Sequence, residues 1–73
     1  MITLLEVPVG KIVRLAEAND TLSKKLRTYG LHVGDLLLVL RVAPLGGPLL
    51  VEANGREIAL GRAVAEKILV EVE

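Results

Sequence analysis

The chain has 73 residues, and its nine lysines and arginines are balanced by nine aspartates and glutamates, with no cysteine. This length suits one small domain spanning residues 1–73 and excludes large enzymes. The absence of cysteine excludes disulfide frameworks and cysteine-ligated metal sites. The zero net charge disfavours a nucleic-acid-binding protein, because such domains normally carry an excess of basic residues.

Aliphatic side chains dominate the apolar part of the chain. Hydrophobic residues account for 52% of the sequence, and Tyr29 is the only aromatic residue. A domain of this size buries only about 60% of the surface that its unfolded chain exposes. We therefore expect part of the aliphatic surface to face a protein partner or a second copy of the chain.

No apolar run is long enough to cross a membrane. The longest, residues 36–40, ends at Arg41, far short of the ~20 residues that a membrane-spanning helix needs. The first residues also lack the basic region of a secretory signal peptide. We therefore expect a cytoplasmic protein without membrane insertion.

A strand and a helix are the first predicted elements. The strand covers residues 11–16, after a proline and a glycine that interrupt the preceding segment. Residues 19–21 then offer side-chain oxygens that can cap a helix. Apolar residues follow at the spacing of one helical face, namely Leu22, Leu26 and Tyr29. This pattern predicts a helix over residues 21–29.

The end of this helix is specified by its sequence. Gly30 suits the left-handed conformation that follows many helices, and Leu31 is then placed to contact Leu26. Gly34 and Asp35 lead into the next strand. We regard Gly30, Leu31 and Gly34 as structural residues.

Residues 36–42 predict a strand with two apolar faces, because seven residues are too few for a typical core helix. Alternation places Leu36, Leu38, Leu40 and Val42 on one face, and Leu37, Val39 and Arg41 on the other. Such a strand is either covered on both faces or leaves one face for a partner. We expect Leu37 and Val39 to lie on the open face, as a contact for a partner or for a homo-oligomer.

The next segment, Pro44-Leu45-Gly46-Gly47-Pro48, predicts a turn that two prolines stiffen. Its glycines resemble a phosphate-binding loop, but Pro48 lacks an amide donor and no Gly-Lys-Ser/Thr follows. Leu45 is a large apolar residue at the expected tip. Two interpretations remain open: Leu45 anchors a partner protein, or it folds back on the barrel.

Asn54 and Gly55 predict a two-residue hairpin turn between strands at residues 49–53 and 56–60, because both turn positions need a positive φ. The turn fixes the register, which pairs Val51 with Ile58, Leu49 with Leu60 and Glu52 with Glu57. One or two helical turns over residues 62–67 and a final strand from residue 68 follow. The order predicts a mainly β fold: a five-stranded, partly open SH3-like barrel with one helix after the first strand and a short helix before the last.

Few residues suggest chemistry. His32 is the only histidine, and with no cysteine present we predict neither a metal site nor a bound cofactor. We interpret Glu52 and Glu57 as a solvated hairpin face rather than an acid–base pair. Ser23 has no second catalytic group at a spacing that would indicate a catalytic triad. We assign no catalytic residue and expect no enzyme.

A basic face on the predicted helix could contact a partner. Lys24, Lys25 and Arg27 lie in a stretch without acidic residues. Such a face is usually only solvated, but Lys24 and Arg27 are candidates for contact with nucleic acid, anionic lipid or an acidic protein patch.

Four segments in order resemble the ferrous iron transport protein A (FeoA) family across nearly the whole chain. They are Gly10 at the end of the N-terminal segment, Leu-Arg-Thr-Tyr-Gly-Leu-His-Val-Gly at residues 26–34, Ala-Pro-Leu-Gly-Gly-Pro at 43–48, and Ile-Ala-Leu at 58–60 with the spacing of Ala65, Ile68 and Val70. Three positions depart from the family pattern, where methionine, proline and arginine are common: Tyr29, Val33 and Gly61.

The resemblance implies an SH3-like barrel and a cytoplasmic accessory role beside FeoB, a ferrous iron permease with a GTP-binding domain. It does not imply that the chain itself carries iron, and the small number of possible ligands argues against it. The barrel is also similar to the SH3-like domain of iron-dependent repressors. A regulatory module that contacts the permease is the leading hypothesis, and a small-barrel nucleic-acid-binding module is the alternative.

Overall fold

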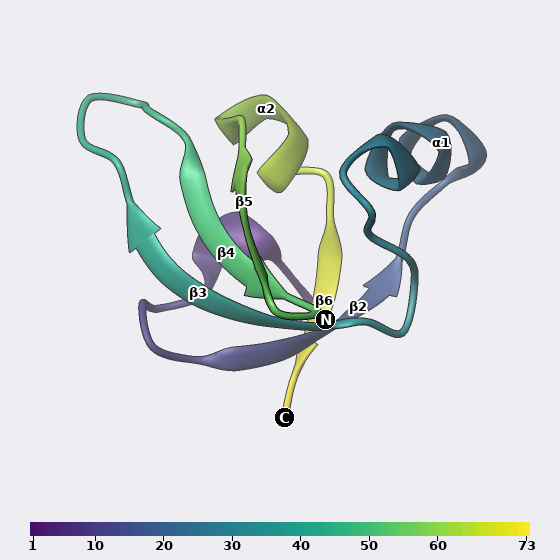
Figure 1. Ribbon diagram of the computed structural model, residues 1–73, viewed down its shortest axis with the longest axis horizontal. Coiled ribbons are helices and arrows are strands. Elements are labelled where there is room, and N and C mark those ends of the chain that lie inside the picture. Colours follow the sequence, from purple (N-terminus) through teal and green to yellow (C-terminus); the bar gives the residue numbers. More distant parts are fainter.

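Six antiparallel strands form one curled sheet in the computed structural model, which describes residues 1–73 (Figure 1). The strand order is β1-β6-β2-β3-β4-β5, so β1 and β5 are the two edges of the sheet. The strands are β1 (Ile2–Thr3), β2 (Ile12–Glu17), β3 (Leu36–Val42), β4 (Leu49–Ala53), β5 (Arg56–Leu60) and β6 (Leu69–Val72). The helices are η1, a 3-10 turn (Leu4–Glu6), α1 (Asp20–Thr28) and α2 (Arg62–Ala65).

The expected mainly β fold is confirmed, with one strand more than the five that were predicted. The additional strand is β1, whose Ile2 and Thr3 lie opposite Val70 and Leu69 of β6. Two residues are too few to show a periodic pattern in the sequence. The second helix is shorter than residues 62–67, because the amides of Lys67 and Ile68 donate to carbonyls three residues back and tighten the chain into a turn.

The core of the sheet corrects the prediction about β3. Leu37 and Val39 are both 0% exposed, so the expectation that they form an open contact face is wrong. Val39 lies opposite Val51 of β4, and Leu37 lies opposite Val13 of β2. Directly opposed residues point to the same face, so β3 turns these side chains into the core. The large apolar residues that this strand exposes are instead Leu36 and Val42.

The end of α1 follows the sequence prediction. Gly30 has a φ of +79°, the left-handed conformation that a β-carbon disfavours. The amide of Leu31 donates to the carbonyl of Leu26 at 3.0 Å, and the amide of Gly30 donates to the carbonyl of Arg27 at 3.0 Å. These two bonds define a Schellman motif, which turns the chain from α1 toward β3.

The hairpin of β4 and β5 also has its expected geometry. Asn54 and Gly55 have φ values of +53° and +77°, as a two-residue turn of type I′ requires. The observed pairs are the predicted ones, namely Val51 with Ile58, Leu49 with Leu60 and Glu52 with Glu57.

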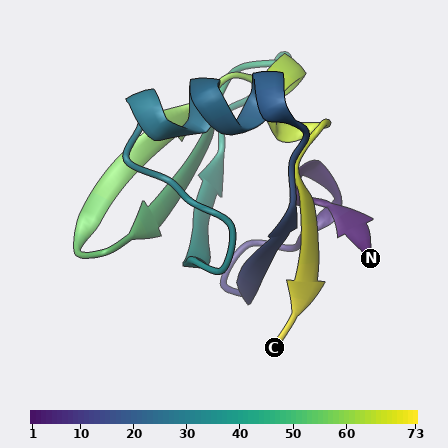
Figure 2. The ribbon, with the colours of Figure 1, turned by 90° about the vertical axis from the view of Figure 1, so that its right-hand side faces the viewer.

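Three segments gather on one side of the molecule. The loop between β3 and β4, helix α2 and helix α1 lie at the top of both views, and the C-terminus lies at the bottom (Figure 1, Figure 2). Neither helix has the length and apolar character that crossing a membrane requires. The top side brings together the segments from which the candidate site is built.

Candidate functional site

The loop between β3 and β4 is a closed turn with Leu45 at its tip. The amide of Ala43 donates to the carbonyl of Pro48 at 3.0 Å, and the amide of Gly47 donates to the carbonyl of Pro44 at 3.1 Å. A β-carbon added at Gly47 would lie only 2.7 Å from the β-carbon of Ala43. A side chain at this position would therefore force the turn open.

Leu45 points into solvent in an unfavourable conformation. Its side chain is fully exposed, at 103%, so the interpretation that it folds back on the barrel is excluded. Its φ is +58°, and a left-handed conformation costs a non-glycine residue about 1–2 kcal/mol. Leaving a leucine in water also forgoes about 1.5–3 kcal/mol of burial free energy. The fold therefore keeps the Leu45 side chain exposed despite an unfavourable backbone conformation and the burial free energy that exposure forgoes.

A guanidinium without a partner lies at the base of this turn. Arg62 is the first residue of α2, and its Nε is buried without any hydrogen bond. A β-carbon added at Gly46 would lie 3.9 Å from that Nε, so the turn covers it. Burying an unpaired donor costs about 1–3 kcal/mol. Neither ion pair of the chain involves Arg62.

A groove of about 750 Å³ runs between α1 and α2. Its apolar lining includes Leu22 from α1, Val64 from α2 and Leu69 from β6. Two basic side chains also line it, Lys25 and Lys67, and neither takes part in an ion pair within the chain. The lining set is Glu17, Ala18, Asn19, Thr21, Leu22, Lys25, Ala63, Val64, Lys67 and Leu69.

The structure separates the basic residues that the sequence grouped together. Lys24 and Arg27 are exposed on α1 but do not line the groove, whereas Lys25 does. Arg27 borders a smaller hollow of about 210 Å³ next to His32. The sequence pointed to neither Arg62 nor Lys67, because the turn and helix that place them meet only in the folded chain.

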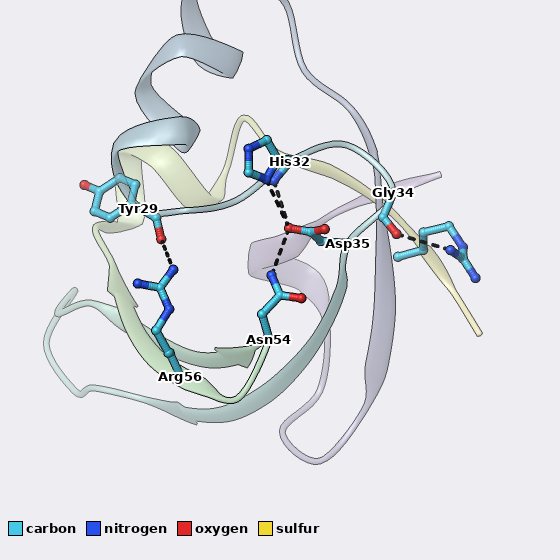
Figure 3. Close-up of polar contacts among 7 residues, drawn as sticks. Tyr29, His32, Gly34, Asp35, Asn54 and Arg56 are labelled. Atoms are coloured by element: carbon cyan, nitrogen blue, oxygen red, sulfur yellow. Dashed lines mark hydrogen bonds and ion pairs between the residues drawn. The ribbon is translucent and has the colours of Figure 1, made fainter.

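A polar cluster fixes the segment between α1 and β3 (Figure 3). The Asp35 carboxylate accepts a hydrogen bond from the His32 amide at 2.9 Å and from the Asn54 side-chain amide at 3.4 Å. The His32 imidazole is 62% exposed, with its Nδ1 3.7 Å from the same carboxylate. The guanidinium of Arg56 donates to the Tyr29 carbonyl at 3.3 Å. These contacts tie the hairpin to the end of α1, and no group of three or more side chains suited to hold a metal ion is present.

The curled sheet, with a projecting turn and an adjoining groove, defines the chain as a small SH3-like β domain whose candidate site is a contact surface. The FeoA domain matches residues 2–72. The chain belongs to the FeoA family.

Similar proteins extend this comparison. A Methanocaldococcus jannaschii protein named "Putative Fe(2+) transport protein A" is 35% identical over 60 residues, which cover 82% of this chain and 71% of that protein. The solution structure of the FeoA protein from Chlorobium tepidum has a TM-score of 0.83 and 34% identity, over 97% of this chain and 70% of that one. The manganese regulator SloR has a TM-score of 0.83 and 27% identity, over 99% of this chain but 34% of the regulator. The same fold thus also forms about a third of a metal regulator.

Proposed function

We propose that this chain is a cytoplasmic accessory protein of ferrous iron transport that acts by docking on a FeoB-type permease. Membership in the FeoA family and the name of the Methanocaldococcus jannaschii relative support the link to iron transport. The observation that carries the docking role is the fully exposed Leu45 at the tip of a closed turn.

The turn is suited to contact a partner at low entropic cost. Two backbone hydrogen bonds and two prolines hold it in one shape before binding. Little conformational freedom is then lost when Leu45 enters an apolar pocket of the partner. Burial of this side chain would contribute about 1.5–3 kcal/mol, which is about a 10-fold to 150-fold change in affinity.

The test is capture of the permease from detergent-solubilised membranes of the source organism. Leu45→Asp should weaken capture by about tenfold or more and lower ferrous iron uptake in cells, with the melting temperature nearly unchanged. Val9→Asp is the matched control, because Val9 is also an exposed apolar loop residue, at 59%, and the substitution adds the same charge.

Three results would contradict the proposal. The wild-type chain could fail to capture the permease, Leu45→Asp could bind as well as wild type, or both variants could lose binding equally. In the third case the added charge, rather than the lost leucine, would explain the effect.

A further inference from the structure

We infer that Arg62 pairs with a carboxylate of the docking partner. The docking surface, formed by Leu45, Arg62 and the groove between α1 and α2, would then recognise a partner segment in which apolar side chains flank acidic ones. The inference rests on the proposed function, because it concerns the chemistry of the same docking surface. It assigns a binding role to Arg62 and a ligand class to the surface.

Arg62 has an unused hydrogen-bonding capacity. Its Nε is buried and makes no hydrogen bond, and the ion pairs of the chain belong to Arg14 and His32 instead. Arg62 as a whole is only half-buried, so part of its side chain stays accessible. A guanidinium presents N–H donors in a fixed fork that matches the two oxygens of a carboxylate.

The position of Arg62 couples this donor to the exposed leucine. Gly46, the residue after Leu45, lies against the Arg62 Nε, as shown by the 3.9 Å separation from a β-carbon added there. A partner that encloses Leu45 therefore lies close to the Arg62 side chain, which packs beside Gly46. One contact buries the apolar side chain, and the other pairs a carboxylate with the terminal nitrogens of the guanidinium, which, unlike Nε, are not buried.

The charged side chains of the neighbouring groove are mostly basic. The next residues of α2, Ala63 and Val64, line the groove, whereas Arg62 itself does not. The groove carries two lysines and one carboxylate, Glu17, so its charged lining complements an acidic segment. Its apolar lining would receive the aliphatic side chains of that segment.

A protein segment fits this surface better than a nucleic acid. Phosphates would also pair with Arg62, but single-stranded nucleic acids normally stack on several aromatic side chains. The surface offers an exposed leucine and an aliphatic groove, and Tyr29, the only aromatic residue, is absent from the groove lining. Binding to an oligonucleotide is therefore an outcome that the experiment must distinguish.

The experiment measures the affinity of three variants for the solubilised permease. Arg62→Gln should weaken binding by about 30-fold, because it removes one partner of a desolvated charge pair. Arg62→Lys should lie between Gln and wild type, because it keeps the charge but loses the planar fork. Lys11→Gln is the matched control for the loss of a positive charge. Lys11 precedes β2 and lies beside the middle of β3, where its carbonyl accepts a hydrogen bond from the amide of Val39, rather than beside the turn that follows β3. The Lys11→Gln variant should therefore bind as wild type does.

A charge exchange separates recognition from folding. Arg62→Glu should abolish capture, and replacing the contacted Asp or Glu of the permease by Arg should restore it. A merely misfolded Arg62 variant would not regain binding through a change in the partner. Melting temperatures of all variants complete the comparison.

The possible results distinguish the inference from the proposed function. If Leu45→Asp loses binding while Arg62→Gln keeps it, the docking role stands and the carboxylate inference is wrong. If the wild-type chain captures no permease, the proposed function and this inference fail together. If Arg62→Gln instead abolishes a strongly salt-dependent affinity for oligonucleotides and leaves permease capture intact, the partner class is wrong.

Discussion

Two neighbouring leucines of β3 provide a sharp test of the fold. Leu37 is 0% exposed and lies in the core, whereas Leu36 is 47% exposed on the opposite face. The substitutions Leu37→Ala and Leu36→Ala remove the same atoms from adjacent positions of one strand. Any difference in their cost therefore reports which face of β3 is buried.

The expected costs differ several-fold. Truncating a fully buried leucine to alanine costs about 2–5 kcal/mol, because burial free energy is lost and a cavity remains. At Leu36 about half of the side chain is already in water, so we expect about 1 kcal/mol or less. A domain of 73 residues has a total stability of about 4–11 kcal/mol, so Leu37→Ala should remove a large part of it.

Thermal and urea unfolding measure this difference. For a domain of 60–100 residues, each 1 kcal/mol shifts the melting temperature by about 4–8 °C. Leu37→Ala should therefore melt at least about 8 °C below wild type, and Leu36→Ala should stay within about 8 °C of it. An unchanged urea m-value would show that neither substitution alters the extent of unfolding.

The reasoning about β3 would be refuted by equal costs or by a larger loss at Leu36. Equal costs would mean that both faces are covered, as in an oligomer that buries Leu36 against a second copy. Repeating the melt over a range of protein concentrations would identify that case, because only an oligomer has a concentration-dependent melting temperature.

Two further predictions concern a backbone conformation and a carboxylate. Gly30→Val should lower the melting temperature more than Gly55→Val: both glycines have a positive φ, but a β-carbon at Gly30 would also displace the guanidinium of Arg56 from its hydrogen bond to the Tyr29 carbonyl. Equal shifts would show that Arg56 moves aside freely. The backbone amide and then the hydroxyl of Thr3 donate to Glu6 and lower the pKa of that carboxyl below its ordinary value of 4.5. Because the folded-state pKa of Glu6 lies below its unfolded-state pKa, the ionised carboxylate stabilises the fold at pH values above the unfolded-state pKa. This stabilisation is lost as the pH falls through the folded-state pKa. Wild type should therefore lose stability relative to Glu6→Gln as pH falls from about 5 to 3, and parallel pH profiles of unfolding would contradict this.

Much of the fold could be predicted because local rules decide it. Gly30 and Leu31 end α1 as expected, since a Schellman motif depends only on residues within two turns of the helix. The hairpin register follows in the same way from Asn54 and Gly55, because a two-residue turn leaves one pairing of its strands.

The features that escaped prediction depend on contacts between distant segments. Both faces of β3 are apolar, so alternation could separate Leu37 from Leu36 but could not tell which one faces the core. The pairing of Val39 with Val51 decides this, and the register of β3 against β4 shifts between Val39 and Arg41. Arg62 escaped for the same reason, because its unpaired Nε is created by the turn at Gly46.

The place of β6 in the sheet has a consequence for the order in which the fold forms. This last strand lies between β1 and β2 and pairs with both, so Ile2 and Leu15 share Val70 as their cross-strand neighbour. A chain emerging from the ribosome can assemble the meander of β3, β4 and β5 from nearby residues. It cannot complete β1 or cover the edge of β2 until β6 has been made. Joining segments so far apart in sequence is slow and leaves an unpaired strand edge exposed meanwhile. The nascent chain is therefore most vulnerable to aggregation in the interval before β6 becomes available for pairing.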